Sequence, residues 1–110
     1  MIENSSYVVV MVTAKDADEA RVIARGLLDE KLVACANIID NIHSLFWWQE
    51  KIDEAKEVLL LLKTRKDLFD RAAKKIKLLH SYETPEIIAI PILAGSLDYL
   101  NWIDLSVRRK

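Results

Sequence analysis

A long stretch without glycine or proline is the feature that most constrains this chain. Residues 34–63 are dense in β-branched and aromatic side chains, which is typical of β-strands. We predict a hairpin with one strand over about residues 34–48, a polar turn at residues 49–51 and a return strand over about residues 52–63. Both strands are long for a globular protein, in which strands usually run about 5–6 residues.

The middle and the end of this hairpin carry two further signals. Asp40 and Asn41 are small polar residues midway along the first strand, and they indicate a bulge. At roughly 3.3 Å per residue the hairpin outreaches the core of a small domain. Its end, with Phe46, Trp47 and Trp48 in succession, is therefore expected to stand in solvent, either as an interface anchor or as a platform for a ligand.

The return strand contains the run Val58–Leu62, which is apolar on both of its faces. Because side chains alternate along a strand, Leu60 points to one face of the sheet and Leu61 to the other. A chain of 110 residues has helices enough to cover one such face, and the other face then needs a partner. We therefore predict an obligate oligomer. The alternative is a central strand with helices of the same chain on both sides.

The bulk composition is that of an ordinary globular protein. Apolar residues make up 52% and charged residues 30% of the chain, and its length fits a single domain. The formal net charge of −1 gives no general attraction to nucleic acid or to a membrane surface. Cys35 is the only cysteine, which excludes an internal disulfide and a thiolate zinc framework. With neither a basic N-terminal region nor a long apolar run, the chain is expected to be cytoplasmic.

The rest of the chain alternates between the periods of strands and helices. The predicted elements besides the hairpin are a strand over residues 7–12, a helix opening at residues 15–19, a second helix opening at residues 65–67, a strand over residues 87–92 and a last helix capped by Ser96. This order is the split βαβ pattern with a small helix added. We predict an α+β, ferredoxin-like domain over residues 1–110, with both main helices on one face of an antiparallel sheet.

The first predicted helix carries its own start signal and one anomaly. Asp16 followed by Glu19 has the spacing of a capping box. Its predicted apolar stripe consists of Ala20, Ile23, Ala24, Leu27 and Leu28. Gly26 interrupts the helix at a cost of about 1 kcal/mol, which indicates close packing against the sheet.

No catalytic constellation stands out, so we expect a protein that is not an enzyme. A nucleophile needs a base placed to activate it, and spacing alone does not pair Cys35 with His43 or His80. Cys35 on a strand is typical of a small buried side chain, and His43 of a surface residue. His80 closes a helix, where the helix dipole favours an imidazolium ion. It is either a solvated cap or the first residue of a functional loop.

The loop that begins at His80 is the segment richest in functional groups. Residues 80–86 read HSYETPE and supply an imidazole, a phenol and two carboxylates. Histidine and carboxylate together suit copper or zinc, especially where a thiol joins them. The spacing matches no preformed metal motif, so the signal for a metal site rests on the residue types.

Several segments carry a family resemblance. They read KLVACANIID with SLFWW, KIDEAKEVLLLLKT, LHSYETPEIIAIPI and DYLNWI. Over nearly the whole chain they closely resemble the CutA divalent-cation-tolerance family. The resemblance implies a ferredoxin-like protomer similar to the PII signalling proteins, assembled as a homotrimer through its long hairpin. It also implies a cytoplasmic protein linked to tolerance of copper and other divalent metals.

The resemblance also implies metal ligands. The family ligands are a cysteine near the end of the first strand and two adjacent histidines before the Tyr-x-x-Pro block. Here these positions hold Val12, Leu79 and His80, so only the last is kept. Cys35 matches another family cysteine and is expected to substitute if it faces a cleft between subunits. The predicted ligands of Cu²⁺ or another divalent cation are therefore His80, Cys35, Glu83 and Tyr82, with Trp48 and Lys63 beside them.

Two hypotheses of function follow. The first is a trimeric protein that binds copper and other divalent metals in metal-ion tolerance. The second is a PII-like regulatory or scaffold trimer that binds a small anion or a partner protein, with metal binding incidental. An acylphosphatase-like enzyme on the same fold would need a glycine-rich anion loop with an arginine after the first strand, and residues 13–16 read TAKD instead.

Overall fold

The structure of the chain is a computed structural model that describes residues 6–109. Its elements are β1 (Tyr7–Ala14), α1 (Ala17–Asp29), β2 (Cys35–Trp48), β3 (Lys51–Arg65), the short 3₁₀ helix η1 (Lys66–Leu68), α2 (Phe69–Leu79), β4 (Ile87–Pro91) and α3 (Leu97–Ser106). The predicted order is confirmed, and so is the α+β, ferredoxin-like class. Residues 1–5, part of the N-terminal region on which the predicted cytoplasmic location depends, lie outside the described residues.

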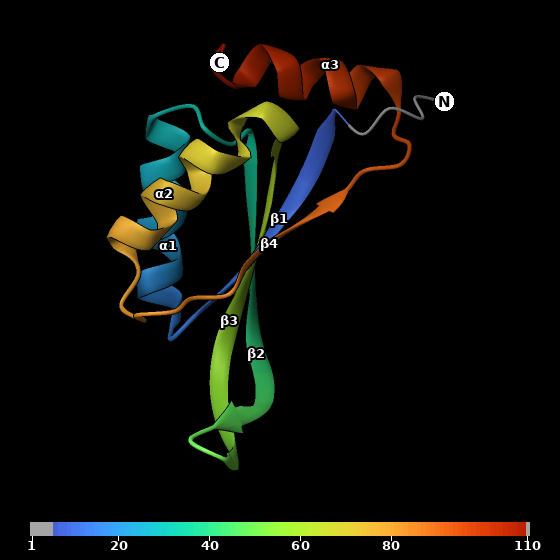
Figure 1. The fold of residues 1–110 in the computed structure, drawn as a ribbon. Helices are drawn as coiled ribbons and strands as arrows, with labels where there is room; N and C mark the ends of the chain where they lie inside the picture. Colours follow the sequence, from blue (N-terminus) through green and yellow to red (C-terminus); the bar gives the residue numbers. More distant parts are fainter. Residues whose placement is uncertain (1–5, 110) are drawn as a thin grey trace.

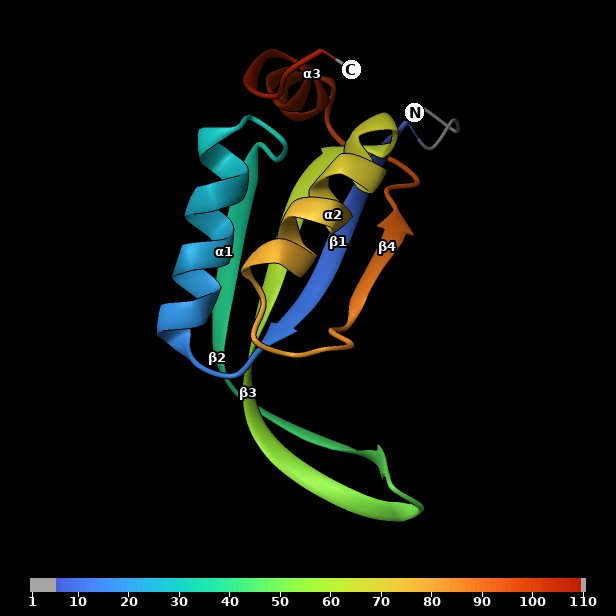
Figure 2. The same ribbon diagram turned by 60° about the vertical axis from the view of Figure 1, so that its left-hand side comes forward.

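The four strands form one antiparallel sheet in the order β2-β3-β1-β4. Helices α1 and α2 lie side by side against one face of the sheet (Figure 2), as right-handed crossovers predict. Helix α3 crosses the end of the sheet near the start of β1 (Figure 1). None of the helices in the described part of the chain has the length and apolar character needed to cross a membrane.

The main core lies between the sheet and the two long helices. Cross-strand partners Val12 and Leu60 meet there, and so do Val10 and Leu62, all with no exposed surface. The largest fully buried side chains that the helices and their flanking turns add are Ile23, Leu27, Leu68 and Ile76. Each such side chain contributes about 1.5–3 kcal/mol when it leaves water, so this layer supplies most of the stability of a single chain.

Helix α1 begins and packs largely as its sequence predicts. The Asp16 carboxylate accepts a hydrogen bond from the Glu19 backbone N–H at 2.8 Å, which confirms the cap. Leu28 is wrong as a member of the buried stripe, because it lies one residue past Leu27 and faces solvent. Gly26 packs against Leu79 of α2, not against the sheet as predicted. Close approach of the two helices is therefore the reason for the glycine.

The β2–β3 hairpin differs from its prediction at the turn. The turn has two residues, Gln49 and Glu50, both with positive φ, and Lys51 already pairs with Trp48. The bulge at Asp40 and Asn41 is confirmed, since both residues stand opposite Val58 alone. Beyond the bulge the hairpin leaves the body of the domain and curves beneath the loop that precedes β4 (Figure 2). Its end stands in solvent in the single chain, as predicted.

Within the described residues, the second face of the sheet (the open face) is covered by a helix only at one end. Tyr7 is buried there against Leu100 and Ile103 of α3. Further along, Ile88 is 49% and Ile90 47% exposed. The alternative of helices over both faces is therefore wrong for most of the sheet. The requirement for a partner on this face stays a prediction.

Candidate functional site

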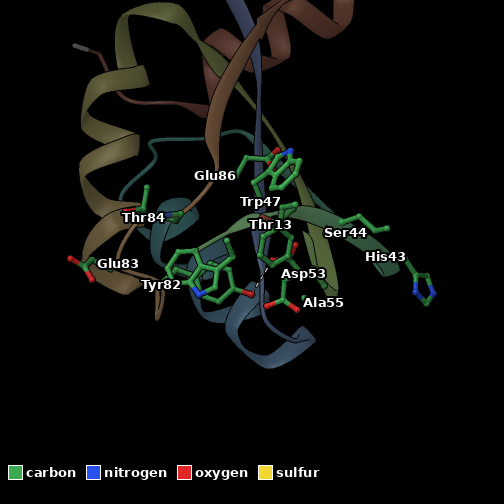
Figure 3. A pocket seen from close by; sticks show the side chains of 15 residues that line it. Thr13, His43, Ser44, Trp47, Asp53, Ala55, Tyr82, Glu83, Thr84 and Glu86 are labelled. Carbon is green, nitrogen blue, oxygen red and sulfur yellow. Dashed lines mark hydrogen bonds between the residues drawn. The ribbon is translucent and has the colours of Figure 1, made fainter. Parts of the chain in front are cut away.

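The curved end of the hairpin and the loop between α2 and β4 enclose a cavity of about 960 Å³ (Figure 3). One face of the hairpin lines it with Ser44, Phe46, Trp48, Asp53, Ala55 and Glu57, which the strand pairing places on the same side. Thr13 and loop residues 82–86 close the opposite wall. The side chains of His43 and Trp47 belong to the other face of the hairpin and lie at the rim, and His43 points away from the cavity in Figure 3.

The lining is acidic. Four carboxylates contribute to it, namely Asp53, Glu57, Glu83 and Glu86, and the described residues add no lysine or arginine. A concave surface lined by charges of one sign concentrates ions of the opposite sign. The cavity therefore favours cations and disfavours anions.

Glu57 is the deepest of these carboxylates. It pairs with Ile42 directly after the bulge, so its side chain lies on the sheet and not at the hairpin tip. Only 8% of its surface is exposed. Its Oε2 accepts a hydrogen bond from the Tyr82 hydroxyl at 2.9 Å, and no lysine, arginine or histidine of the described chain forms an ion pair with it. A nearly buried negative charge thus faces the cavity with a neutral partner.

Tyr82 joins the loop to the sheet through this bond. Burial raises the pKa of the Tyr82 hydroxyl to about 12, and the hydrogen bond to Glu57 adds to the shift. The phenol therefore remains a donor at any physiological pH and holds the loop against β3.

His80 connects the same loop to strand β1. Its Nε2 lies 2.7 Å from the Thr13 carbonyl oxygen, and its Nδ1 accepts the Tyr82 backbone N–H at 3.0 Å. Because a carbonyl only accepts, this geometry assigns the proton to Nε2 and describes a neutral ring. The side chain is fully buried, so the hypothesis of a solvated cap is wrong. Both ring nitrogens are engaged within the chain.

Glu19 completes the anchoring of the loop. Its two carboxylate oxygens accept the backbone N–H groups of Lys15 and Ser81, at 3.1 and 3.0 Å. Burial acts to raise the pKa of this carboxyl, but the hydrogen bonds from Ser81 and Lys15 outweigh it, and the net pKa lies below the ordinary value. The start of the loop is therefore held by an ionised, buried acid.

Cys35 lies elsewhere. It is half-buried and pairs with Lys63, whose Nζ approaches Sγ to 4.0 Å and also contacts Asn37. Along the sheet, Lys63 pairs with Val9, four residues and about 13 Å from Thr13. An ammonium group beside the thiol opposes a metal cation at that position.

The structure therefore brings together only part of the predicted ligand set. Tyr82 and Glu83 line the cavity, His80 lies behind the loop, and Cys35 is at the other end of the sheet. Across residues 6–109, no three His, Cys, Asp or Glu side chains of one chain are arranged to hold a metal ion. Of the two neighbours predicted, Trp48 faces the cavity and Lys63 does not.

The predicted ligand set left out three acids of this site, Asp53, Glu57 and Glu86. Glu57 offered a signal, because it occupies a face position directly before the apolar run of β3. Glu86 was counted only as one of the two carboxylates of the loop, and Asp53 offered no signal. Their convergence depends on how far the hairpin bends toward the loop, which no local pattern encodes.

The sequence of this chain matches one family of known proteins. The family profile described as CutA1 divalent ion tolerance protein matches residues 8–106. A divalent-cation tolerance protein CutA of Archaeoglobus fulgidus is 45% identical over 89% of this chain and 95% of its own length. One of Thermus thermophilus is 41% identical over 86% of this chain and 92% of its own length. A chloroplastic CutA 1 of rice is 41% identical over 92% of this chain, which spans 57% of the rice protein.

Solved structures agree with the sequence comparison. The divalent cation tolerance protein Cut A1 of Thermus thermophilus superposes with a TM-score of 0.91 at 38% identity, over 93% of this chain and 99% of that one. CutA1 of rice gives a TM-score of 0.92 at 38% identity, over 97% of this chain and all of that one. At this level of identity and coverage the likeness extends to the sequence as well as to the fold.

Proposed function

Because this chain belongs to the CutA1 divalent ion tolerance protein family, we propose that it supports divalent-cation tolerance in the cytoplasm, as a homotrimer that binds the cations. The observation that carries this proposal is the acidic lining of the hairpin cavity, with four carboxylates and no lysine or arginine among the described residues. The cytoplasmic location is supported by the single cysteine, since one thiol can form no disulfide within the chain.

The donor atoms determine which cations fit. Carboxylate and phenol oxygens suit hard divalent ions, which keep several of their own water molecules when they bind. We propose that Glu57, Glu83 and Glu86, with Tyr82 beside them, attract the hydrated cation as separate oxygen donors and do not form a complete ligand set within the described part of one chain. Cu²⁺ prefers nitrogen and sulfur, and the two predicted donors of that kind are engaged or remote. Copper is therefore expected to bind here through oxygen, more weakly than at an imidazole and thiol site.

A trimer would supply what one chain lacks. No cluster of three ligands is complete within residues 6–109, so a stable metal site needs ligands from a second subunit. The exposed Ile88 and Ile90 on the open face, and the exposed Leu45 and Ile52 on the hairpin, offer the apolar surface that such an assembly buries. The regulatory alternative retains the trimer, but the acidic lining opposes its small anion.

Calorimetric titration of the purified protein with Mg²⁺ and Cu²⁺ tests the cation site. The variant Glu83→Gln with Glu86→Gln should weaken binding at least about tenfold, since each lost charged interaction is worth about 1.5–3 kcal/mol. Glu54→Gln is the matched control, because Glu54 lies on the opposite face of the same strand. If Cys35→Ser abolishes copper binding while the double variant binds normally, the proposed cation site is wrong.

A further inference from the structure

The cavity lining includes the aromatic residues Phe46, Trp47, Trp48 and Tyr82, and metal binding does not account for them. Phe46 and Trp48 project from the hairpin face that carries Asp53 and Glu57, and Tyr82 faces them from the loop. At about 960 Å³ the cavity lies near the upper end of the 300–1,000 Å³ typical of sites for organic ligands. A hydrated divalent ion would occupy a small part of it and would make no use of the aromatic walls.

Glu57 points independently to a positively charged ligand. Its carboxylate is more than nine-tenths buried, it has no ion-pair partner within the described chain, and it lines the cavity. Burying an uncompensated charge is costly. The Tyr82 hydroxyl satisfies Oε2, which leaves Oε1 as the acceptor available to a donor in the cavity.

Aromatic faces and carboxylates together recognise organic cations. An ammonium group over a tryptophan or tyrosine ring is attracted by the ring quadrupole, and methylene groups pack on the same surface. A protonated primary amine also donates hydrogen bonds, which the free oxygen of Glu57 requires and a quaternary ammonium cannot supply. Four carboxylates around one cavity favour a ligand with several positive charges.

We propose that this cavity binds a linear aliphatic polyamine. One terminal ammonium group donates to Glu57, the methylene chain lies on Phe46 and Trp48, and the remaining ammonium groups meet Asp53 and Glu86 near the rim. The polyamine and the divalent cation of the proposed function compete for the same carboxylates. Only the polyamine uses the aromatic wall, so the two proposals fail separately.

Titration calorimetry of the intact protein tests the inference, with spermidine as the probe and Mg²⁺ and tetramethylammonium as comparisons at equal ionic strength. Spermidine should bind at least about tenfold tighter than either. Trp48→Leu should weaken spermidine binding about fivefold and leave Mg²⁺ binding unchanged. Glu57→Gln should weaken spermidine binding about tenfold or more, and the glutamine oxygen still accepts the Tyr82 hydroxyl.

Matched controls separate site recognition from general attraction to an acidic surface. Trp102→Leu on α3 and Glu54→Gln on the outer face of β3 should bind spermidine as the parent protein does. Light scattering of each variant identifies any that loses its parent assembly, and Phe46→Leu then replaces Trp48→Leu. Spermidine affinity that is unchanged in Trp48→Leu, that falls equally in Glu54→Gln, or that does not exceed that of Mg²⁺ overturns the proposal.

Discussion

The two faces of strand β3 carry the same kind of residue but differ in how far those residues are buried. On the helix side, Leu60 and Leu62 have no exposed surface. On the opposite side Leu59 and Leu61 are only partly covered, and the neighbouring Ile88 is half exposed. One run of leucines therefore serves two purposes. Its helix-side residues hold the single chain together, and its other residues form a surface that the described part of the chain leaves largely uncovered.

The open face also changes character along its length. The open face is apolar around Leu61. Four residues earlier on β3 it carries Glu57, which is buried beneath Tyr82. The apolar part is suited to a second copy of the chain, and the acidic part to a cation. Because both belong to one continuous strand, assembly of subunits and binding of a ligand are expected to be coupled.

The largest effect should come from placing a charge on the open face. Leu61→Asp should convert the proposed homotrimer to single chains, because burial of an unpaired carboxylate in an apolar interface costs several kcal/mol, about 3–5 at a minimum. Light scattering at micromolar concentration measures the mass. Leu78→Asp on the exposed side of α2 is the control and should leave the mass unchanged. A parent protein that is a stable monomer at this concentration removes the basis for the trimer.

Truncation on the helix side should act on folding instead. Leu60→Ala leaves a cavity in the main core and should lower the free energy of unfolding by about 3 kcal/mol. Leu78→Ala, at 78% exposure, should change it by less than about 0.5 kcal/mol. Urea unfolding at one fixed protein concentration compares them, since assembly makes stability concentration-dependent. Equal losses for the two variants would mean that the helix layer is not the core.

The contrast between the faces also explains what the sequence could predict. The hairpin follows from a run of β-branched and aromatic residues, the bulge from the small polar residues Asp40 and Asn41, and the helix order from the 3.6-residue period, all of which are local properties. Gly26 was assigned to the wrong neighbour because period alone does not tell whether a helix meets a sheet or another helix. Its true contact, Leu79, lies 53 positions along the chain.

The candidate site was harder to predict for the same reason. Residue types around His80 predicted a functional loop, and in the structure Tyr82 and Glu83 of this loop line the cavity. The direction of the His80 ring depends on the Thr13 carbonyl and on the Tyr82 backbone, and neither contact follows from the spacing of residues along the chain. Sequence therefore located the loop, whereas packing decided which of its groups are available.

The acidic end of the open face can be tested through Tyr82. Tyr82→Phe leaves Glu57 without its donor and should lower the free energy of unfolding by about 2 kcal/mol. The parent pKa of about 12 exceeds the ordinary 10.0, so the protonated phenol favours the folded state. This stabilisation is present below pH 10 and is lost as pH rises toward 12. Unfolding curves at several alkaline pH values should show this decline in the parent and not in the variant.

Glu19 offers the corresponding test at acid pH. Its pKa lies below the ordinary 4.5, so the ionised form favours the folded state. That stabilisation is present above about pH 4.5 and is lost as pH falls through the lower folded pKa. Glu19→Gln should therefore cost about 1 kcal/mol at pH 7, with the difference shrinking in acid. Asp18→Asn on the exposed side of α1 is the control, and a gap that stays constant down to pH 3 contradicts the assignment.

The smallest effect is expected at Gly26, where α1 lies close to Leu79 of α2. Alanine in place of a helical glycine gains about 1 kcal/mol. A Cβ at this position would lie 2.7 Å from Leu79 Cδ1, so the leucine must move, and as the end of a flexible side chain it can do so at a similar cost. Gly26→Ala should therefore change the free energy of unfolding by less than about 0.5 kcal/mol. A loss above about 2 kcal/mol in urea would show that Leu79 is unable to move and that α1 and α2 are rigidly packed. A full gain of about 1 kcal/mol would show that Leu79 moves at no cost.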